Sequence, residues 1–384
     1  MLLIKKLLGV LLRFFGLQNI ILIEAEPTKR ENTEAVLGEI LRRGWGRRYR
    51  IILYANAPEA LVHLRTNRVS VIKRPTYGDN RAAFWQMWWL RLRSVMIIDE
   101  NLQAKKNDPK TIHVFLSHGS CVKRIREYYN CKPDTDYMLN QSEFWKPINE
   151  YQLKIPRERL VTLGFPRNDI LFSSPLDPTE LFGKRFEKIV AWYPTFRQHP
   201  NRRGDGQFHG SFSIPVIHDE AAAQKINEYA AKYNVLLVLK PHPVQDVAYL
   251  KDLQLDHLIM VNDQFFLEHQ TTDYAFLAKT DAMITDYSSV VMDYLLTQKP
   301  IALTFEDYEQ YKEQIGFAID MELLRSCATI LDTPEDFDAF FRDLVSGNDP
   351  LRERRLELMH LTNQYTDGHS TERVVDWLET LLDK

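Results

Sequence analysis

The feature of this chain that most constrains its fold is a repeated alternation of short apolar runs with helical patterns. In the first half, helical patterns at residues 32–43 and 58–65 separate the first apolar runs. Strands are predicted at residues 19–23, 49–54, 69–73, 95–98, 112–116, 137–139 and 161–163. Because strands that alternate with helices pair in parallel, this half is predicted to be a parallel sheet with crossover helices.

The same alternation begins again after a serine- and proline-rich stretch at residues 173–178, which is predicted to be a linker. Helices are predicted at residues 220–233, near 290–296 and from about 370 to the end. Strands are predicted at residues 189–192, 235–239, 257–261, 282–285, 301–305 and 328–331. A chain of 384 residues exceeds one ordinary core. We therefore expect an α/β protein with two Rossmann-like, doubly wound domains, at residues 19–175 and 176–384.

Composition narrows the class of protein. Hydrophobic residues make up 45% of the chain and charged residues 26%, which is an ordinary globular balance. The net charge of -3 gives no basic field that would attract nucleic acid. The cysteines are Cys121, Cys131 and Cys327, which form no Cys-x-x-Cys pair, so a reducing cytoplasm is expected rather than a disulfide-bonded secreted fold.

Residues 1–18 begin with large apolar side chains at helical spacing, interrupted by Lys5, Lys6 and Arg13. This stretch is too short and too charged to cross a bilayer, which takes about 20 apolar residues. No cleavage site of small residues follows it. A basic amphipathic helix at the membrane interface is predicted, so that the protein is peripheral to the membrane. The alternative is a helix that packs on its own domain.

A second segment has the same two interpretations. Trp85, Trp88 and Trp89 lie close to Arg91 and Arg93. Such a cluster suits a membrane interface or a lipid-linked acceptor. It is equally typical of a helix that covers the first sheet.

Polar side chains follow the predicted strands at their carboxyl ends, where α/β sheets bind ligands. In the first half, His118 and Gly119 follow the strand at 112–116, and Arg167 follows the strand at 161–163. A histidine can act as a general base near neutral pH, and an arginine can bind phosphate. The alternative for His118 is a capping or core histidine, and the residues Asn168 and Asp169 can cap the helix that follows.

In the second half, Thr195 follows the first strand, and Lys240 and His242 follow the strand at 235–239. The prolines on either side of His242 stiffen its loop. Ser288 and Ser289 precede a helix, where free amides and the helix dipole favour an anion. The alternative there is an ordinary serine cap. No Asp-x-Asp or His/Cys cluster has convincing ligand spacing, so no metal site is predicted, although a diphosphate can bring Mg²⁺ with it.

Taken in order, these motifs resemble the CDP-glycerol glycerophosphotransferase family, which includes the teichoic acid primases and polymerases. The matching stretches are HG at His118, GFPRND, YPTFR, KPHP, TDYSSVVMDY and DGHSTERV. The resemblance implies a GT-B-like fold, with two domains facing a central cleft and CDP held mainly by the second. It also implies that an acceptor hydroxyl attacks the phosphorus next to the polyol and that CMP leaves.

The resemblance also assigns roles to residues. It implies that His118 is the general base and that His242 steadies the diphosphate. The donor-binding set that it implies is Gly119, Ser120, Arg167, Pro194, Thr195, Lys240, Ser288, Ser289 and Asp293. The implied acceptor is a lipid-linked glycan or polyol phosphate at the cytoplasmic face of the membrane, in teichoic acid or capsule-type polymer synthesis.

Two other functions remain open at this point. A GT-B glycosyltransferase that uses a nucleotide sugar would place a diphosphate in the same way. A non-catalytic, membrane-bound nucleotide-binding module is a third reading, but it would have no need for histidines at the strand ends.

Overall fold

The computed structural model describes residues 16–25, 31–55, 58–75, 81–100, 105–125, 135–195, 197, 214–242, 245, 250, 253 and 255–383. The chain divides into two compact units. Unit 1 comprises Met1–His118, Asn130–Asp169 and Asp367–Lys384, and unit 2 comprises Gly119–Tyr129 and Ile170–Thr366. The predicted amphipathic helix at residues 1–18 lies almost entirely outside the described residues.

Unit 1 is built on a parallel sheet of seven strands in the order β3-β2-β1-β4-β5-β6-β7. The strands are β1 (Gln18–Ala25), β2 (Arg50–Ala55), β3 (Val69–Lys73), β4 (Ser94–Asp99), β5 (Ile112–Phe115), β6 (Tyr137–Asn140) and β7 (Leu160–Thr162). The helices are α2 (Glu31–Arg42), α3 (Arg81–Arg93), α4 (Trp145–Leu153) and α15 (Ser370–Leu382), with 3-10 turns that include η3 (Pro58–Leu64) and η5 (Pro166–Asp169).

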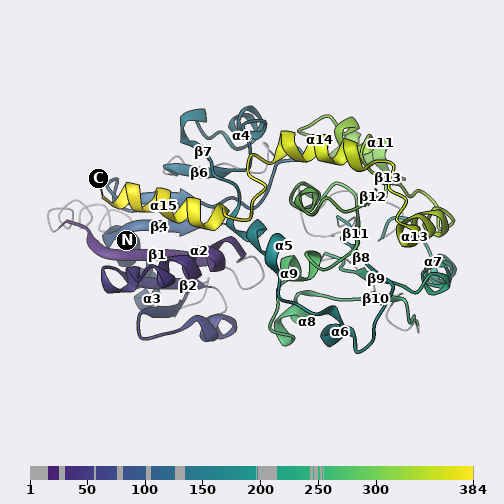
Figure 1. Ribbon diagram of the computed structural model, residues 1–384. Coiled ribbons are helices and arrows are strands. Elements are labelled where there is room, and N and C mark those ends of the chain that lie inside the picture. The colour runs from purple at the N-terminus through teal and green to yellow at the C-terminus, as the bar shows by residue number, and fades with distance from the viewer. Residues whose placement is uncertain are drawn as a thin grey trace. The chain divides into compact units, whose positions relative to one another are not determined.

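Both faces of this sheet are covered, which explains why its strands are apolar at nearly every position. Ile21 and Ile23 of β1 point to the face packed by α2 and α15. Ile20 and Leu22, one residue out of phase, point to the face packed by Leu90 of α3. Figure 1 shows α15, in yellow, beside α2.

Helix α3 carries the tryptophan and arginine cluster, and it packs on the sheet. Its buried Arg91 donates two hydrogen bonds of 2.7 Å to Glu24 of β1. Trp85 and Trp88 meet edge to face, with their ring centroids 5.4 Å apart. Trp89 remains 39% exposed. The last turn of α3 therefore covers the first sheet, while the membrane-interface alternative for the exposed Trp89 stays a prediction.

Unit 2 has a parallel sheet of six strands in the order β10-β9-β8-β11-β12-β13. The strands are β8 (Lys188–Trp192), β9 (Val235–Leu239), β10 (Leu258–Met260), β11 (Ala282–Thr285), β12 (Ile301–Leu303) and β13 (Thr329–Ile330). The helices are α5 (Ile170–Ser173), α6 (Pro178–Phe182), α7 (Glu220–Lys232), α8 (Asp263–Glu268), α9 (Asp273–Leu277), α10 (Val290–Tyr294), α11 (Tyr308–Gln314), α12 (Glu322–Arg325), α13 (Asp336–Ser346) and α14 (Arg352–Thr362).

The core of unit 2 lies between its sheet and two helices. Ala223 and Ile226 of α7, together with Phe337 and Phe341 of α13, pack against the aliphatic side chains of β8, β9 and β11. Trp192, at the end of β8, is fully buried against Phe337, with the ring centroids 5.3 Å apart. The last residues of β8 are therefore held firmly at the edge from which the functional loops leave.

The observed units correct the predicted domains 19–175 and 176–384. The chain passes into unit 2 at Ile170, and the final segment, Asp367–Lys384, belongs to unit 1. The predicted linker at 173–178 is packed, since the buried Ser174 donates a hydrogen bond to the carbonyl of Ala275. The amphipathic pattern of the last helix indicated an apolar face but not the sheet that this face covers.

The start of α15 is capped from a distant part of the chain. The Asp169 carboxylate accepts hydrogen bonds from the amides of Ser370, at 2.9 Å, and Thr371, at 2.7 Å. Its own N-cap residue, His369, makes no side-chain capping bond. Capping of the following helix by Asn168 or Asp169 was one alternative for this motif; the Asp169 carboxylate caps α15 instead and fixes that helix in unit 1.

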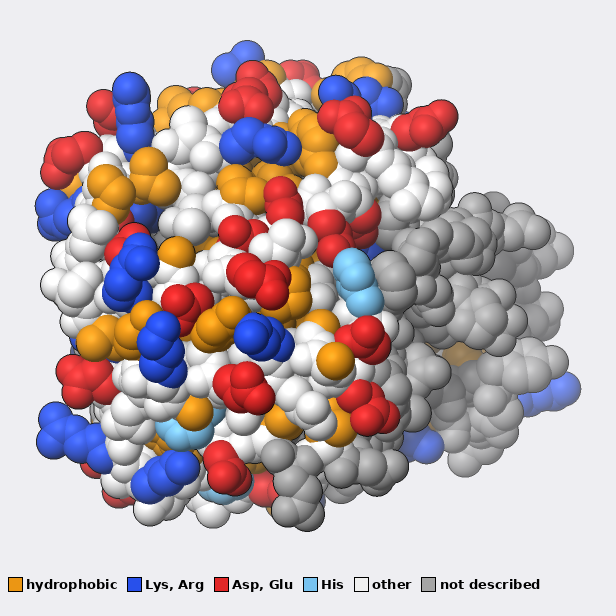
Figure 2. Space-filling model, turned by 90° about the vertical axis from the view of Figure 1, so that its right-hand side faces the viewer, with side chains coloured by type: hydrophobic (Ala, Val, Ile, Leu, Met, Phe, Trp, Pro, Cys, Tyr) orange, Lys and Arg blue, Asp and Glu red, His pale blue; other side chains and the backbone are white. Residues whose placement is uncertain are grey.

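The surface carries charges of both signs. Figure 2 shows Lys and Arg side chains interspersed with Asp and Glu over one face, in keeping with the net charge of -3. Among the described residues, no helix is long and apolar enough to cross a membrane.

Replacing Asp169 with Ala should lower the free energy of unfolding by about 1–2 kcal/mol, because two helix amides lose their acceptor. Urea denaturation measures this loss. Asp376→Ala is the matched control, since the Asp376 side chain lies on the same helix, is 68% exposed, and forms a surface ion pair with Arg43 that contributes little to stability. Its effect should stay within about 0.5 kcal/mol. Equal losses in the two variants would contradict the capping role of Asp169.

Candidate functional site

The strand order of unit 2 reverses between β8 and β11, and such a reversal is where open α/β sheets bind ligands. The loops that leave these two strands are joined to each other. The amide of Thr195, after β8, donates to both carboxylate oxygens of Asp286, after β11, at 3.0 Å each. Pro194 and Thr195 are buried, and the Thr195 hydroxyl has no hydrogen-bond partner in the part of the chain that the structure describes. That hydroxyl is itself buried, so its contact with a ligand stays a prediction.

A buried arginine holds these loops together. The Arg197 guanidinium forms ion pairs with Asp286, at 2.8 Å, and Asp307, at 2.5 Å. It also lies over the ring of Tyr287, 5.2 Å from the centroid. Burial alone would lower the pKa of Arg197, but the two carboxylates raise it above its ordinary value. Arg197 is therefore a permanent cation that neutralises two aspartates.

The same arginine reaches the loop after β9. Its amide donates to the Gln245 side chain at 2.7 Å, and the Gln245 amide donates to the carbonyl of His242 at 2.8 Å. Arg197 belongs to the YPTFR motif, but no role was predicted for it from the sequence. In the sequence, Arg197 lies two residues beyond Thr195, and its partners Asp286 and Asp307 follow two later strands.

The two cationic residues predicted after β9 have different surroundings. The ammonium of Lys240 lies 2.7 Å from Asp263 and 3.6 Å from Asp273. His242 is half-buried. Pro243, which was expected to stiffen the loop together with Pro241, lies outside the described residues. The structure therefore ties Lys240 to carboxylates, and the contact of Lys240 with phosphate stays a prediction.

Ser288 and Ser289 lie at the start of α10, as expected. Both are half-buried, and Ser289 is the N-cap residue but makes no side-chain capping bond. Asp293 is almost fully buried in α10 and accepts a hydrogen bond of 2.5 Å from the Tyr274 hydroxyl. The two serines are accessible to a ligand, whereas Asp293 is directed to a partner inside unit 2, and its role in donor binding stays a prediction.

In unit 1, the Ser117–His118 turn follows β5 and leaves His118 exposed. Ser117 has a φ of 68° and Gly119 a φ of 138°, so the chain takes left-handed conformations on both sides of the histidine. The glycine in the motif is explained by this turn. Ser120 is buried, and its carbonyl accepts from the amide of Val122 at 3.0 Å.

Two side chains hold the backbone around His118. Asn32, in the first turn of α2, donates to the carbonyl of Ser117 at 3.2 Å. Arg167 donates to the carbonyl of His118 at 3.1 Å, and its own amide donates to Asn32 at 3.0 Å. Arg167 was predicted as a phosphate contact; the structure shows that it is buried and bonded to the His118 turn. Asn32 was not identified from the sequence.

Glu100, directly after β4, is fully buried behind these groups. Its carboxylate accepts a hydrogen bond of 2.7 Å from the amide of Thr33, and its second oxygen has no partner among the described residues. Burial raises the pKa of Glu100 to about 8, although the Thr33 amide and the charge of Arg167 act in the opposite direction. Glu100 was missed from the sequence because a single glutamate after a strand carries no motif.

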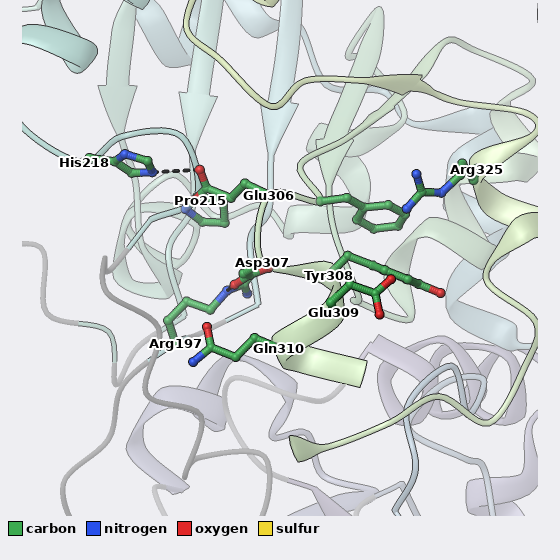
Figure 3. Close-up of a pocket in the computed structure, with 10 residues that line it drawn as sticks. Arg197, Pro215, His218, Glu306, Asp307, Tyr308, Glu309, Gln310 and Arg325 are labelled. Atoms are coloured by element: carbon green, nitrogen blue, oxygen red, sulfur yellow. Dashed lines mark hydrogen bonds and ion pairs between the residues drawn. The ribbon is translucent and has the colours of Figure 1, made fainter. Parts of the chain in front are cut away.

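A pocket of about 570 Å³ opens in unit 2 where β12 ends. Residues 305–310 line it together with Arg197, Pro215, His218 and Arg325. Figure 3 shows His218 and Arg325 on opposite sides of the pocket. His218 is bonded to Glu306 at 2.7 Å. This pocket was not predicted from the sequence.

No group of three or more His, Cys, Asp or Glu residues is arranged to hold a metal ion within the described ranges.

Replacing Glu100 with Gln should flatten the pH dependence of stability. A carboxyl whose pKa is raised in the native state stabilises the fold below its ordinary pKa of 4.5, and this stabilisation is lost as the pH rises through about 8. Between those pH values the wild type should lose more unfolding free energy than Glu100→Gln, by a few kcal/mol. Urea unfolding at a series of pH values measures this difference. The exposed Glu158→Gln variant serves as the control, and a wild-type curve parallel to that of Glu100→Gln would contradict the raised pKa.

Comparisons with known proteins match the family that the sequence motifs resemble. The family described as CDP-Glycerol:Poly(glycerophosphate) glycerophosphotransferase matches residues 25–380. The teichoic acid ribitol-phosphate polymerase TarK of Staphylococcus aureus is 26% identical over 229 residues, which are 58% of this chain but 40% of that protein. This chain therefore spans less than half of that relative. The teichoic acid glycerol-phosphate primase of Bacillus subtilis is 22% identical over 327 residues, covering 77% of this chain and 76% of that protein.

Solved structures show the same fold. The wall teichoic acid polymerase TagF superposes with a TM-score of 0.71 at 15% identity, over 99% of this chain and 93% of that chain. A UDP-N-acetylglucosamine 2-epimerase superposes with a TM-score of 0.54 at 11% identity, over 94% and 95% of the two chains. Together with the two parallel sheets, these likenesses confirm the predicted α/β, GT-B-like fold class.

Proposed function

Because this chain belongs to the CDP-glycerol:poly(glycerophosphate) glycerophosphotransferase family, we propose that it transfers glycerol phosphate, or a related polyol phosphate, from a CDP-linked donor to an acceptor hydroxyl. CMP is the second product, and the reaction belongs to the synthesis of teichoic acid or a capsule-type polymer. The proposal depends on one observation. Where the strand order reverses, the Thr195 amide donates a hydrogen bond to Asp286, and the accessible Ser288 and Ser289 follow in the same loop.

The donor is assigned to unit 2. The diphosphate lies along the carboxyl edge of its sheet, where the amides and hydroxyls of Ser288 and Ser289 and the hydroxyl of Thr195 donate to its oxygens. His242, in its protonated form, steadies the charge that develops on the departing CMP. Lys240 adds a second cation beside it. A Mg²⁺ ion carried by the donor is compatible with this arrangement but is not needed for it.

The chemical step is a substitution at the phosphorus that carries the polyol. His118 accepts the proton of the acceptor hydroxyl, and the oxygen forms a bond to that phosphorus. The bond between the phosphorus and the bridging oxygen breaks, and its electron pair leaves with CMP. Asn32 and Arg167 support this role of His118, because they fix the backbone that carries the imidazole.

The acceptor in this proposal is lipid-linked and is met at the cytoplasmic face of the membrane. The support is the basic and apolar pattern of residues 1–18 and the exposed Trp89, over which the Arg93 guanidinium lies at 5.5 Å. The names of the relatives give the support for teichoic acid as the polymer.

Thermal unfolding in the presence of candidate donors tests the donor class. CDP-glycerol and CDP-ribitol should raise the melting temperature, because a ligand that binds only the folded protein stabilises it. UDP-sugars are the comparison. Stabilisation by UDP-sugars alone would reject the CDP-polyol assignment in favour of a glycosyltransferase, and donor binding without turnover on any acceptor would favour a non-catalytic module.

Replacing His118 with Ala should lower CMP release by at least about 100-fold, because the general base is lost, while donor affinity changes little. His242→Ala should weaken both donor binding and turnover. CMP release and donor titration measure the two effects. His369→Ala is the matched control, since His369 is an exposed histidine of the same unit as His118. Full activity of His118→Ala would remove His118 from the mechanism.

A further inference from the structure

We propose that the pocket at the end of β12 binds the polyol end of the donor; this inference rests on the proposed function. The pocket would take an uncharged, hydroxyl-rich group of a few carbon atoms. Four kinds of observation support it: the position of the pocket along the sheet, the charges of its lining, the stacking of its aromatic rings on other groups, and the exposed carboxylate of Glu309.

The position follows from the strand order. Along the carboxyl edge of the sheet, the loops of β9, β8, β11 and β12 follow one another, since these strands are neighbours in that order. Neighbouring strands are about 4.8 Å apart. A diphosphate over the β8 and β11 loops therefore has the pocket one strand further along. Arg197 and Asp307 belong both to the pocket wall and to the network that joins these loops.

The charge of the pocket disfavours a phosphate. Its lining includes the carboxylates of Glu306, Asp307 and Glu309. The guanidinium of Arg197 is already paired with Asp286 and Asp307, which leaves Arg325 as the other arginine of the lining. Carboxylate oxygens accept hydrogen bonds from hydroxyl groups and repel phosphate oxygens. Asp307 is paired with Arg197 and Glu306 with His218, so Glu309 is the carboxylate of this lining that favours a polyol hydroxyl over a phosphate.

The aromatic rings of the pocket disfavour a nucleobase. Tyr308 is stacked on Phe317, with centroids 5.4 Å apart, and the Arg325 guanidinium lies 4.9 Å from its centroid. Phe305 is stacked on Tyr287 at 5.3 Å, and Arg325 lies 5.4 Å from its centroid. Each ring is thus already covered by an aromatic partner and by the same guanidinium. The pocket offers hydrogen-bonding groups rather than a stacking platform.

Glu309 is the carboxylate that is available to a ligand. It is exposed at the pocket, in the first turn of α11, and makes no hydrogen bond or ion pair within the described ranges. Glu306, in contrast, accepts from the amide of Val216 at 2.9 Å and contacts His218. Figure 3 shows Glu309 beside Tyr308 and on the other side of the pocket from His218. We therefore assign hydrogen bonds from the polyol hydroxyls to Glu309.

The test compares donors that differ only in the polyol. Titration calorimetry of Glu309→Gln with CDP-glycerol and with CDP should show affinity for CDP-glycerol lowered about ten-fold, because a hydrogen bond to a charged acceptor becomes one to a neutral amide. Affinity for CDP should stay within about two-fold. Glu313→Gln is the matched control, since Glu313 is an exposed glutamate of the same helix outside the pocket lining.

The other possible outcomes distinguish failure of this inference from failure of the proposed function. Equal loss of affinity for CDP and CDP-glycerol would assign the pocket to the nucleotide, and unchanged affinity for both would remove Glu309 from the donor site; either result overturns the inference and leaves the proposed function standing. Failure of the unchanged protein to bind CDP or CDP-glycerol would instead overturn the proposed function, and the inference with it.

Discussion

The geometry of unit 2 depends on the ion pairs of one buried guanidinium. Arg197 neutralises Asp286 and Asp307, which leave the ends of two neighbouring strands, and its backbone holds the Gln245 side chain of a third loop. A buried charge is tolerated only when its partners are fixed around it, so the three loops cannot rearrange independently. The position of the Thr195 amide, the turn at His242 and one wall of the β12 pocket all follow from this arrangement.

Unit 1 positions its histidine by a different physical means. The His118 turn is held by neutral acceptors, the carbonyls of Ser117 and His118, to which Asn32 and Arg167 donate. Behind these donors lies a carboxyl whose burial favours its protonated form. Hydrogen bonds to backbone carbonyls fix the path of the chain and leave the imidazole itself exposed. Such an arrangement suits a group that must exchange a proton with a substrate.

The sequence was most informative where a structural element is determined by its own residues. The strands at 69–73, 235–239 and 282–285 have the predicted bounds. At 235–239 and 282–285, a run of buried side chains marks a covered parallel strand. Loops at strand ends were located for the same reason. The terminal helix was also predicted to begin near residue 370, and it begins at Ser370.

The features that were missed depend on contacts between distant residues. Asp169 caps a helix that begins 201 residues later, and Arg197 meets a carboxylate 110 residues away. No local pattern reveals which partner such a side chain will meet. The pocket is a further example, since it combines residues 305–310 with Arg197, His218 and Arg325. Sequence patterns placed the loops at one edge, and only the packed structure shows which side chains meet there.

The return of the last helix to the first sheet has a consequence for biosynthesis. Val374, Val375, Leu378 and Leu381 belong to the core of unit 1, yet they follow the whole of unit 2 in the chain. Unit 2, whose last residue is Thr366, is complete in the nascent chain before unit 1 is. The unit that is begun first is therefore completed last, because the face of its sheet that α2 and α15 share is only partly covered until residues 370–382 have been synthesised.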